Sequence, residues 1–140
     1  IIMNGSIANS LINYFQADKS KLHPFTVKRI EAGIPVSASD YVSAIEKAKK
    51  MEQILKQLFT KYDAIITPAA PGQAPRDLMN TGNAIFNGYW TMMGVPAISL
   101  PFLKGKDNLP IGIQFMANWR EDLKLLEISK YILEKEKLAD

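Results

Sequence analysis

Neutral polar side chains with the potential for chemistry are concentrated between residues 67 and 91. The carboxamide and hydroxyl groups at its centre are those of Gln73, Asn80, Thr81, Asn83 and Asn87. Phe86 and Trp90 are four residues apart and would share one face of a helix, and Asn87 and Thr91 form a neighbouring polar pair at the same spacing. Flat apolar walls beside neutral hydrogen-bonding groups would suit an apolar acyl or aryl group attached to an amide. We therefore predict substrate-binding roles for Phe86, Asn87, Trp90 and Thr91, against the alternative that both aromatic residues are ordinary core.

Side chains for the commonest catalytic and metal-binding sites are scarce. The chain has no cysteine and only one histidine, His23, which excludes a thiolate nucleophile, a cysteine zinc site and a multi-histidine metal site. It also lacks the sequence motifs of nucleophile elbows, phosphate-binding loops, dinucleotide-binding folds and zinc proteases. His23 precedes a proline in a charged segment, so we expect a surface or capping role for it. The sequence therefore predicts no catalytic residue and no metal ligand within this chain.

Composition and charge are those of an ordinary globular protein. Of the 140 residues, 47% are hydrophobic and 22% are charged, which argues against disorder. The longest uncharged run, 82–102, is broken by Asn, Thr, Gly and Pro, so no transmembrane helix is expected. The net charge is +3, but the lysines are scattered along helical patterns, so nucleic acid is not an expected partner. We expect a cytoplasmic protein and, because the chain opens Ile1-Ile2-Met3, the tail end of a longer one.

Hydrophobic periodicity predicts a helical N-terminal third followed by strands and helices. We expect helices over 7–15, 41–62, 83–93 and 121–137, a short segment over 24–33, and strands over 63–67, 97–100 and 111–115. The last two strands would form a hairpin across the polar turn 104–108. The first strand is apolar on both faces and would need cover from both sides. The predicted fold class is α/β: a single domain over 1–140 that is a fragment of a larger mixed β-sheet covered by helices.

Four sequence runs, in the right order and spacing, resemble the C-terminal portion of the amidase signature family. They are "IEAGIPVSASDYVSAIEKAKKMEQILKQLFTKYD", "YDAIITPAAPGQAP", "TGNAIFNGYWTMMGVPAISLP" and "LPIGIQFMANWREDLKLLEISKYILE". The resemblance covers about residues 28–134 and leaves 1–27 outside the clearest match. It implies an enzyme that hydrolyses or transfers carboxamides through a Ser, cis-Ser, Lys triad, with no metal or organic cofactor. The triad belongs to a Gly/Ser-rich region in the family's N-terminal half, and no Gly-Gly-Ser-Ser-Gly stretch is present here.

The resemblance also bears on the substrate pocket. In the family, the C-terminal part completes the sheet, and the helix before "GVPAISLP" most often faces the acyl group. The family member that makes amidated tRNA typically carries Asp, Thr and Asn at positions held here by Ala84, Asn87 and Thr91. Loss of the carboxylate removes the group expected to hold the α-ammonium of glutamine, which implies a general amidase with a less charged pocket.

Three hypotheses for function follow from these observations. The main one is the C-terminal domain of an amide hydrolase that supplies sheet and pocket wall but no triad, so that this chain alone would be inactive. The alternatives are a non-catalytic binding or assembly module, and a fragment of the amidase-like subunit of a tRNA-dependent amidotransferase, whose basic surface would meet RNA. The expected partner is a small-molecule amide, and an exposed sheet edge would favour homodimers or aggregates.

Overall fold

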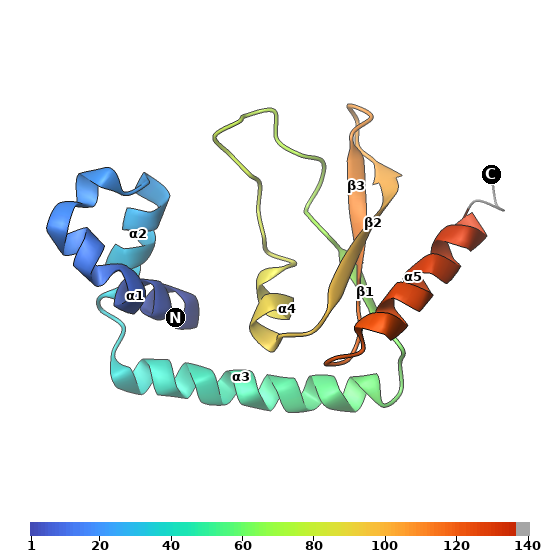
Figure 1. Cartoon of the computed structure of the whole chain (residues 1–140), viewed down its shortest axis with the longest axis horizontal. Coiled ribbons are helices and arrows are strands. Elements are labelled where there is room, and N and C mark those ends of the chain that lie inside the picture. Colours follow the sequence, from blue (N-terminus) through green and yellow to red (C-terminus); the bar gives the residue numbers. More distant parts are fainter. Residues whose placement is uncertain (137–140) are drawn as a thin grey trace. The chain divides into compact units, whose positions relative to one another are not determined.

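The structure is a computed structural model that describes residues 1–136. Tertiary contacts divide the chain into two compact units, Ile1–Met51 and Glu52–Asp140, and the helix α3 (Ala38–Phe59) runs from one unit into the other. Figure 1 shows the helices of the first unit and the sheet of the second. Within residues 1–136, no helix is long and apolar enough to cross a membrane.

The first unit is a pair of packed helices followed by the beginning of α3. The helix α1 (Ile2–Asp18) is joined by a 3-10 turn, η1 (Lys19–Lys21), to α2 (Pro24–Gly33). The two helices approach closely at Gly33, where an added Cβ would lie 2.6 Å from the backbone carbonyl carbon of Asn4 and 2.7 Å from Ala8 Cβ. The helix α1 is longer than the expected 7–15, because packing against α2 stabilises turns that local propensity leaves undecided.

Side-chain caps fix the beginnings of two helices. The Ser37 hydroxyl accepts the N–H of Asp40 at 3.0 Å and donates to the Asp40 carboxylate at 2.7 Å. This is the predicted Ser-x-x-Asp beginning of the long helix. The Nδ1 of His23 accepts the backbone N–H of Phe25 at 3.2 Å at the beginning of α2, so the capping role expected for His23 is confirmed.

The second unit is built on a three-stranded antiparallel sheet. Its strands β1 (Ile65–Pro68), β2 (Ala97–Lys104) and β3 (Pro110–Met116) lie in the order β1-β3-β2. The predicted hairpin of β2 and β3 is confirmed, and its loop is closed by the N–H of Gly105 on the carbonyl of Leu109 at 2.8 Å. Asn108 takes the left-handed conformation that such a loop requires, with φ of 61°. Helices and a sheet combine as predicted for an α/β chain, and every strand pairing among residues 1–136 is antiparallel.

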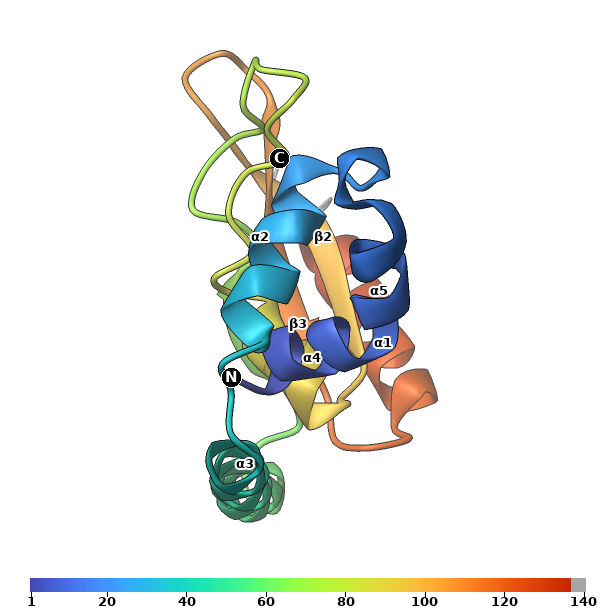
Figure 2. The same cartoon turned by 90° about the vertical axis from the view of Figure 1, so that its left-hand side faces the viewer.

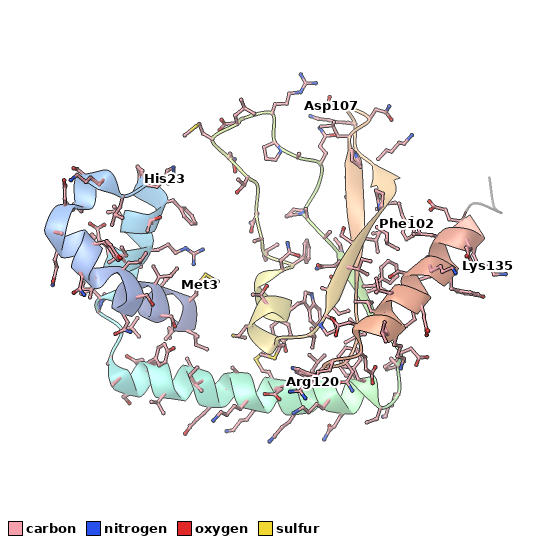
Figure 3. All side chains as sticks on the ribbon, in the orientation of Figure 1. Met3, His23, Phe102, Asp107, Arg120 and Lys135 are labelled. Carbon is pink, nitrogen blue, oxygen red and sulfur yellow. The ribbon has the colours of Figure 1, made fainter. Side chains whose placement is uncertain are left out.

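The helix α5 (Asp122–Glu136) covers one face of this sheet. The buried core there consists of Leu100, Phe115, Ala117 and Leu125. Phe102 packs edge-to-face on Phe115 with ring centroids 6.1 Å apart, and Figure 3 shows Phe102 on the side of the sheet that faces α5. Ile66 lies opposite Phe115 in the strand register but is 60% exposed, so the expected cover on both sides of the first strand is not found within residues 1–136.

The helix predicted over 83–93 is shorter in the structure. The helix α4 spans only Gly88–Met93, and residues 83–87 form a loop and a turn. The carboxamide oxygens of Asn80 and Asn83 accept the backbone N–H groups two residues ahead, at 2.9 and 3.0 Å. These local bonds offer the backbone an alternative to the helix, which is why the periodicity of the apolar residues misplaced its beginning.

Candidate functional site

A hollow of about 580 Å³ opens in the second unit, between the loop that follows β1 and the beginning of β3. Its lining carries no charged side chain. It consists of Ala70, Pro71, Gly72, Gln73, Ala74, Pro75, Thr81, Gly82, Asn83, Ala84, Asn87, Pro110, Ile111 and Gly112. Three prolines keep this loop out of helix and central strand. The hollow therefore presents neutral amide and hydroxyl groups beside apolar surface, which suits an uncharged ligand.

The floor of the hollow is made by close contact between the loop and the sheet. The N–H of Ala69 donates to the carbonyl of Gly112 at 2.9 Å, which continues the pairing of β1 with β3 into the loop. A Cβ added at Gly112 would collide with the Ser99 hydroxyl and lie 3.0 Å from Ala69 Cβ. Glycine at position 112 is therefore what allows the loop to approach the hairpin this closely.

The far end of the loop is attached to the tip of the hairpin. The amide of Gln73 makes two bonds to Asp107: its Nε2 donates to the carboxylate, and its Oε1 accepts the Asp107 backbone N–H at 3.1 Å. Arg76 pairs with the same carboxylate at 3.2 Å. Figure 3 shows Asp107 at the hairpin tip, and in Figure 1 and Figure 2 the loop rises beside the hairpin to this height.

Gln114 holds the opposite end of the loop. Its side chain is buried on β3, and its Nε2 donates to Thr67 Oγ1 at 2.8 Å, to the carbonyl of Pro68 at 3.1 Å and to the carbonyl of Phe86 at 2.9 Å. Sequence analysis did not single out this residue. The available signal was a carboxamide at an alternate position of a strand otherwise rich in isoleucine, flanked by threonine and serine at its partner positions, Thr67 and Ser99.

The structure brings one of the four predicted substrate-binding residues into the hollow. Asn87 lines it and donates through Nδ2 to the carbonyl of Ala69 at 3.1 Å. The hydroxyl of Thr91 donates to the backbone carbonyl of Asn87 at 3.0 Å and is exposed. Phe86 and Trp90 are half-buried and do not line the hollow; the Trp90 ring lies edge-to-face on Tyr89, with centroids 5.1 Å apart.

No side chain described in residues 1–136 forms an activated nucleophile or a metal site. Serine hydroxyls bond to Tyr41, to carboxylates and to a backbone carbonyl, and in this part of the chain none bonds to a lysine, a histidine or another serine. No group of three His, Cys, Asp or Glu side chains capable of holding a metal ion is found in the same range. The site can therefore bind and orient a ligand, but these residues supply no group to attack it.

A second, larger hollow of about 770 Å³ lies in the first unit, between α1 and the link from α2 to α3. A hydrogen bond of 2.9 Å joins Ser6 to Tyr41 within its lining. None of the predicted substrate-binding residues lies there. Gly5 allows the Tyr41 ring to come this close, because an added Cβ would lie 3.0 Å from the ring.

Comparison with known proteins identifies the family. The family model described as Amidase matches residues 4–126, which is most of the chain. The chain belongs to the amidase family. The resemblance predicted from the four sequence runs is thus confirmed, and the match begins near the N-terminus instead of at residue 28.

Relatives in the amidase family include both amidotransferase subunits and amidases. The amidase-like subunit of the glutamyl-tRNA(Gln) amidotransferase from Aliarcobacter butzleri is 36% identical over 111 residues, which is 71% of this chain and 24% of that protein. A putative amidase, AmiC, of Mycobacterium leprae is 27% identical over 128 residues, which is 80% of this chain and 26% of that protein. The chain therefore spans about a quarter of the length of these relatives.

Solved structures of amidase-family enzymes share this fold. A crystal structure of an amidase superposes with a TM-score of 0.83 at 21% identity, over 94% of this chain and 33% of that one. The structure of 6-aminohexanoate cyclic dimer hydrolase superposes with a TM-score of 0.67 at 20% identity, over 87% of this chain and 31% of that one. At these identities the likeness establishes the fold, and the predicted α/β class is confirmed.

Proposed function

We propose that this chain is part of an enzyme that cleaves the C–N bond of a neutral carboxamide, and that it supplies sheet and one wall of the substrate pocket. The observation that carries the proposal is the uncharged hollow in a chain of the amidase family. Its amide and hydroxyl groups can donate to a carbonyl oxygen and accept from an amide nitrogen. The nucleophile and its base would come from outside these residues, and no metal or organic cofactor is required.

Ala84 supports a neutral substrate over an amino-acid amide. It lies in the lining of the hollow, at the position where the resemblance implies a carboxylate in the family member that makes amidated tRNA. Without that carboxylate, an α-ammonium group would enter the hollow unpaired, and burying an unpaired charge is costly. We propose that Phe86 and Trp90 contribute apolar surface next to Asn87, through the half of each ring that remains exposed.

The second candidate is the amidase-like subunit of a tRNA-dependent amidotransferase. The identity of 36% to the Aliarcobacter butzleri protein favours it, and the putative amidase of Mycobacterium leprae is less similar in sequence. The two candidates share C–N chemistry and differ in the acceptor of the released ammonia: water for the hydrolase, an activated glutamyl-tRNA for the amidotransferase.

Ammonia release from three substrates tests the proposal. The intact protein, meaning this chain with whatever sequence adjoins it, should hydrolyse benzamide and acetamide and should turn over glutamine far more slowly. Turnover of glutamine alone, stimulated by Glu-tRNA(Gln), would instead establish the amidotransferase. The 140-residue chain by itself should hydrolyse none of the three, because loss of the nucleophile and its base removes nearly all acceleration. Turnover by that chain that is abolished by Ser99→Ala would overturn the assignment.

A further inference from the structure

We propose that Gln114 is a positioning residue that fixes the loop 69–86 on the sheet and thereby sets the geometry of the hollow. The proposal rests on the proposed function in one respect, namely that the hollow receives the substrate. Gln114 itself does not line the hollow, so its effect on a ligand would be transmitted through the loop.

The bonds of Gln114 join the two ends of the loop. Pro68 is the last residue of β1 before the loop leaves the sheet, and Phe86 lies in the turn where the loop returns. One carboxamide donates to the backbone carbonyls of both, at 3.1 and 2.9 Å, although the two residues are eighteen positions apart in the chain. Both partners are carbonyl oxygens, which only accept, so the –NH₂ end of the side chain must face them.

Thr67 completes this arrangement. Its hydroxyl accepts from Gln114 at 2.8 Å and donates to the carbonyl of Pro68 at 3.3 Å. The strand register places Thr67 directly opposite Gln114, so the two side chains emerge on the same face. With only 5% of Gln114 exposed, water does not compete freely for these bonds, and an unpaired carboxamide at this place would be costly.

A second amide ties the same two ends one residue further on. Asn87 donates to the carbonyl of Ala69 at 3.1 Å, and Ala69 in turn donates to Gly112 on β3 at 2.9 Å. Asn87 lines the hollow, so the position of its carboxamide depends on where Gln114 holds Phe86, the residue before it. Two side chains therefore keep the mouth of a long, proline-rich loop closed, which fixes the space that the loop encloses.

Two substitutions remove the donors while keeping the size of the side chain. Gln114→Met leaves the two carbonyls without a partner and introduces no charge. Gln114→Glu places carboxylate oxygens against carbonyl oxygens. Gln57→Glu is a matched control, because Gln57 is an exposed glutamine of α3 whose side chain makes no hydrogen bond in the described part of the chain. Thr67→Val is a milder variant that removes one acceptor, for use if the Gln114 variants fail to fold.

Amide hydrogen exchange and steady-state kinetics of the intact protein test the inference together. In Gln114→Met, exchange within 69–86 should accelerate by about tenfold while exchange in α5 stays unchanged. The KM for benzamide should rise about tenfold, and kcat for acetamide should stay within about twofold, because only the larger substrate would reach the displaced loop. Gln57→Glu should change neither measurement. A merely structural role would slow both substrates alike as the folded fraction falls.

The outcomes separate this inference from the proposed function. If the wild-type protein hydrolyses no amide, the proposed function is wrong, and the exchange measurement alone decides whether Gln114 fixes the loop. If the wild-type protein is active and Gln114→Met changes neither loop exchange nor KM, the positioning role is wrong. Faster exchange over the whole second unit would also overturn it, since Gln114 would then support the sheet in general.

Discussion

The carboxamide of Asn87 donates a hydrogen bond of 3.1 Å to the backbone carbonyl of Ala69, across eighteen residues of sequence. This bond connects the end of the loop to its beginning, and it places a neutral donor and acceptor in the lining of the hollow. The residue thus serves both the loop and the candidate site.

Replacing Asn87 with alanine should lower the free energy of unfolding by about 1 kcal/mol, the usual net value of one hydrogen bond in a partly buried place. Denaturant unfolding would measure it. Asn13→Ala on α1 is the control, because Asn13 is exposed and its side chain makes no hydrogen bond in the described part of the chain. Equal stability of Asn87→Ala and wild type would show that the bond to Ala69 does not hold the loop.

The two tryptophans should respond differently to truncation. In the intact protein, Trp90→Ala should lower kcat/KM for a bulky neutral amide by roughly 1–3 kcal/mol, the range for lost apolar pocket contacts, and leave acetamide nearly unaffected. Trp119 has a structural role, since its indole N–H donates to the carbonyl of Met93 at 2.7 Å and Lys56 lies 5.1 Å from the centre of its ring. Trp119→Ala should therefore lower the melting temperature and affect both amides alike. If Trp90→Ala behaves in the same way, Trp90 is a core residue.

Exposed apolar surface on the edge strand β1 should promote self-association of the isolated chain. Ile66 is 60% exposed on that strand, and no strand pairs with the outer edge of β1 within residues 1–136. We expect dimers or larger species by analytical ultracentrifugation, and Ile66→Lys should shift them toward monomer. Leu123→Lys, at an exposed position of α5, is the control and should have a smaller effect. A wild-type chain that remains monomeric at high concentration would contradict this prediction.

Acid titration should reveal the cap between α1 and α2. The hydroxyl and backbone N–H of Ser20 donate to the Asp18 carboxylate at 2.6 and 3.1 Å, and these bonds, the hydroxyl foremost, hold the pKa of Asp18 below its ordinary value of 3.8. Because the folded state favours the ionised carboxylate, the cap stabilises the protein above pH 3.8, and this stability is lost as the pH falls through the lowered pKa.

The Ser20→Ala variant separates the contribution of the hydroxyl. It should move the pKa of Asp18 upward, toward 3.8, in a nuclear magnetic resonance titration of the carboxyl group. Ser10→Ala on α1, where the hydroxyl makes no hydrogen bond among the described residues, should leave it in place. An unchanged pKa of Asp18 in Ser20→Ala would show that the hydroxyl is not the main cause of the shift.

Local sequence signals predicted most of the secondary structure, because the interactions behind them join neighbouring residues. Ser37 and Asp40 announce the beginning of α3 within one turn, and the apolar stripe of that helix repeats every three or four residues. The hairpin was predictable since its loop contains its own signals, Gly105 and Asn108, between two alternating runs. The prediction failed where two local signals compete: periodicity favoured a helix from Asn83, while the asparagine side chains favour turns.

The candidate site depended on contacts that no local pattern encodes. By itself, the sequence determined the family, the neutral character of the segment 67–91 and Asn87 as a candidate, since these follow from residue type and order. Only the tertiary structure showed that Gln114 joins Pro68 to Phe86 and that Gln73 meets Asp107. These partners are 18 to 46 residues apart, and their meeting depends on strand register and on the path of a loop. Register shifted by one residue would turn Gln114 to the opposite face of the sheet, which is why the fold as a whole had to position it.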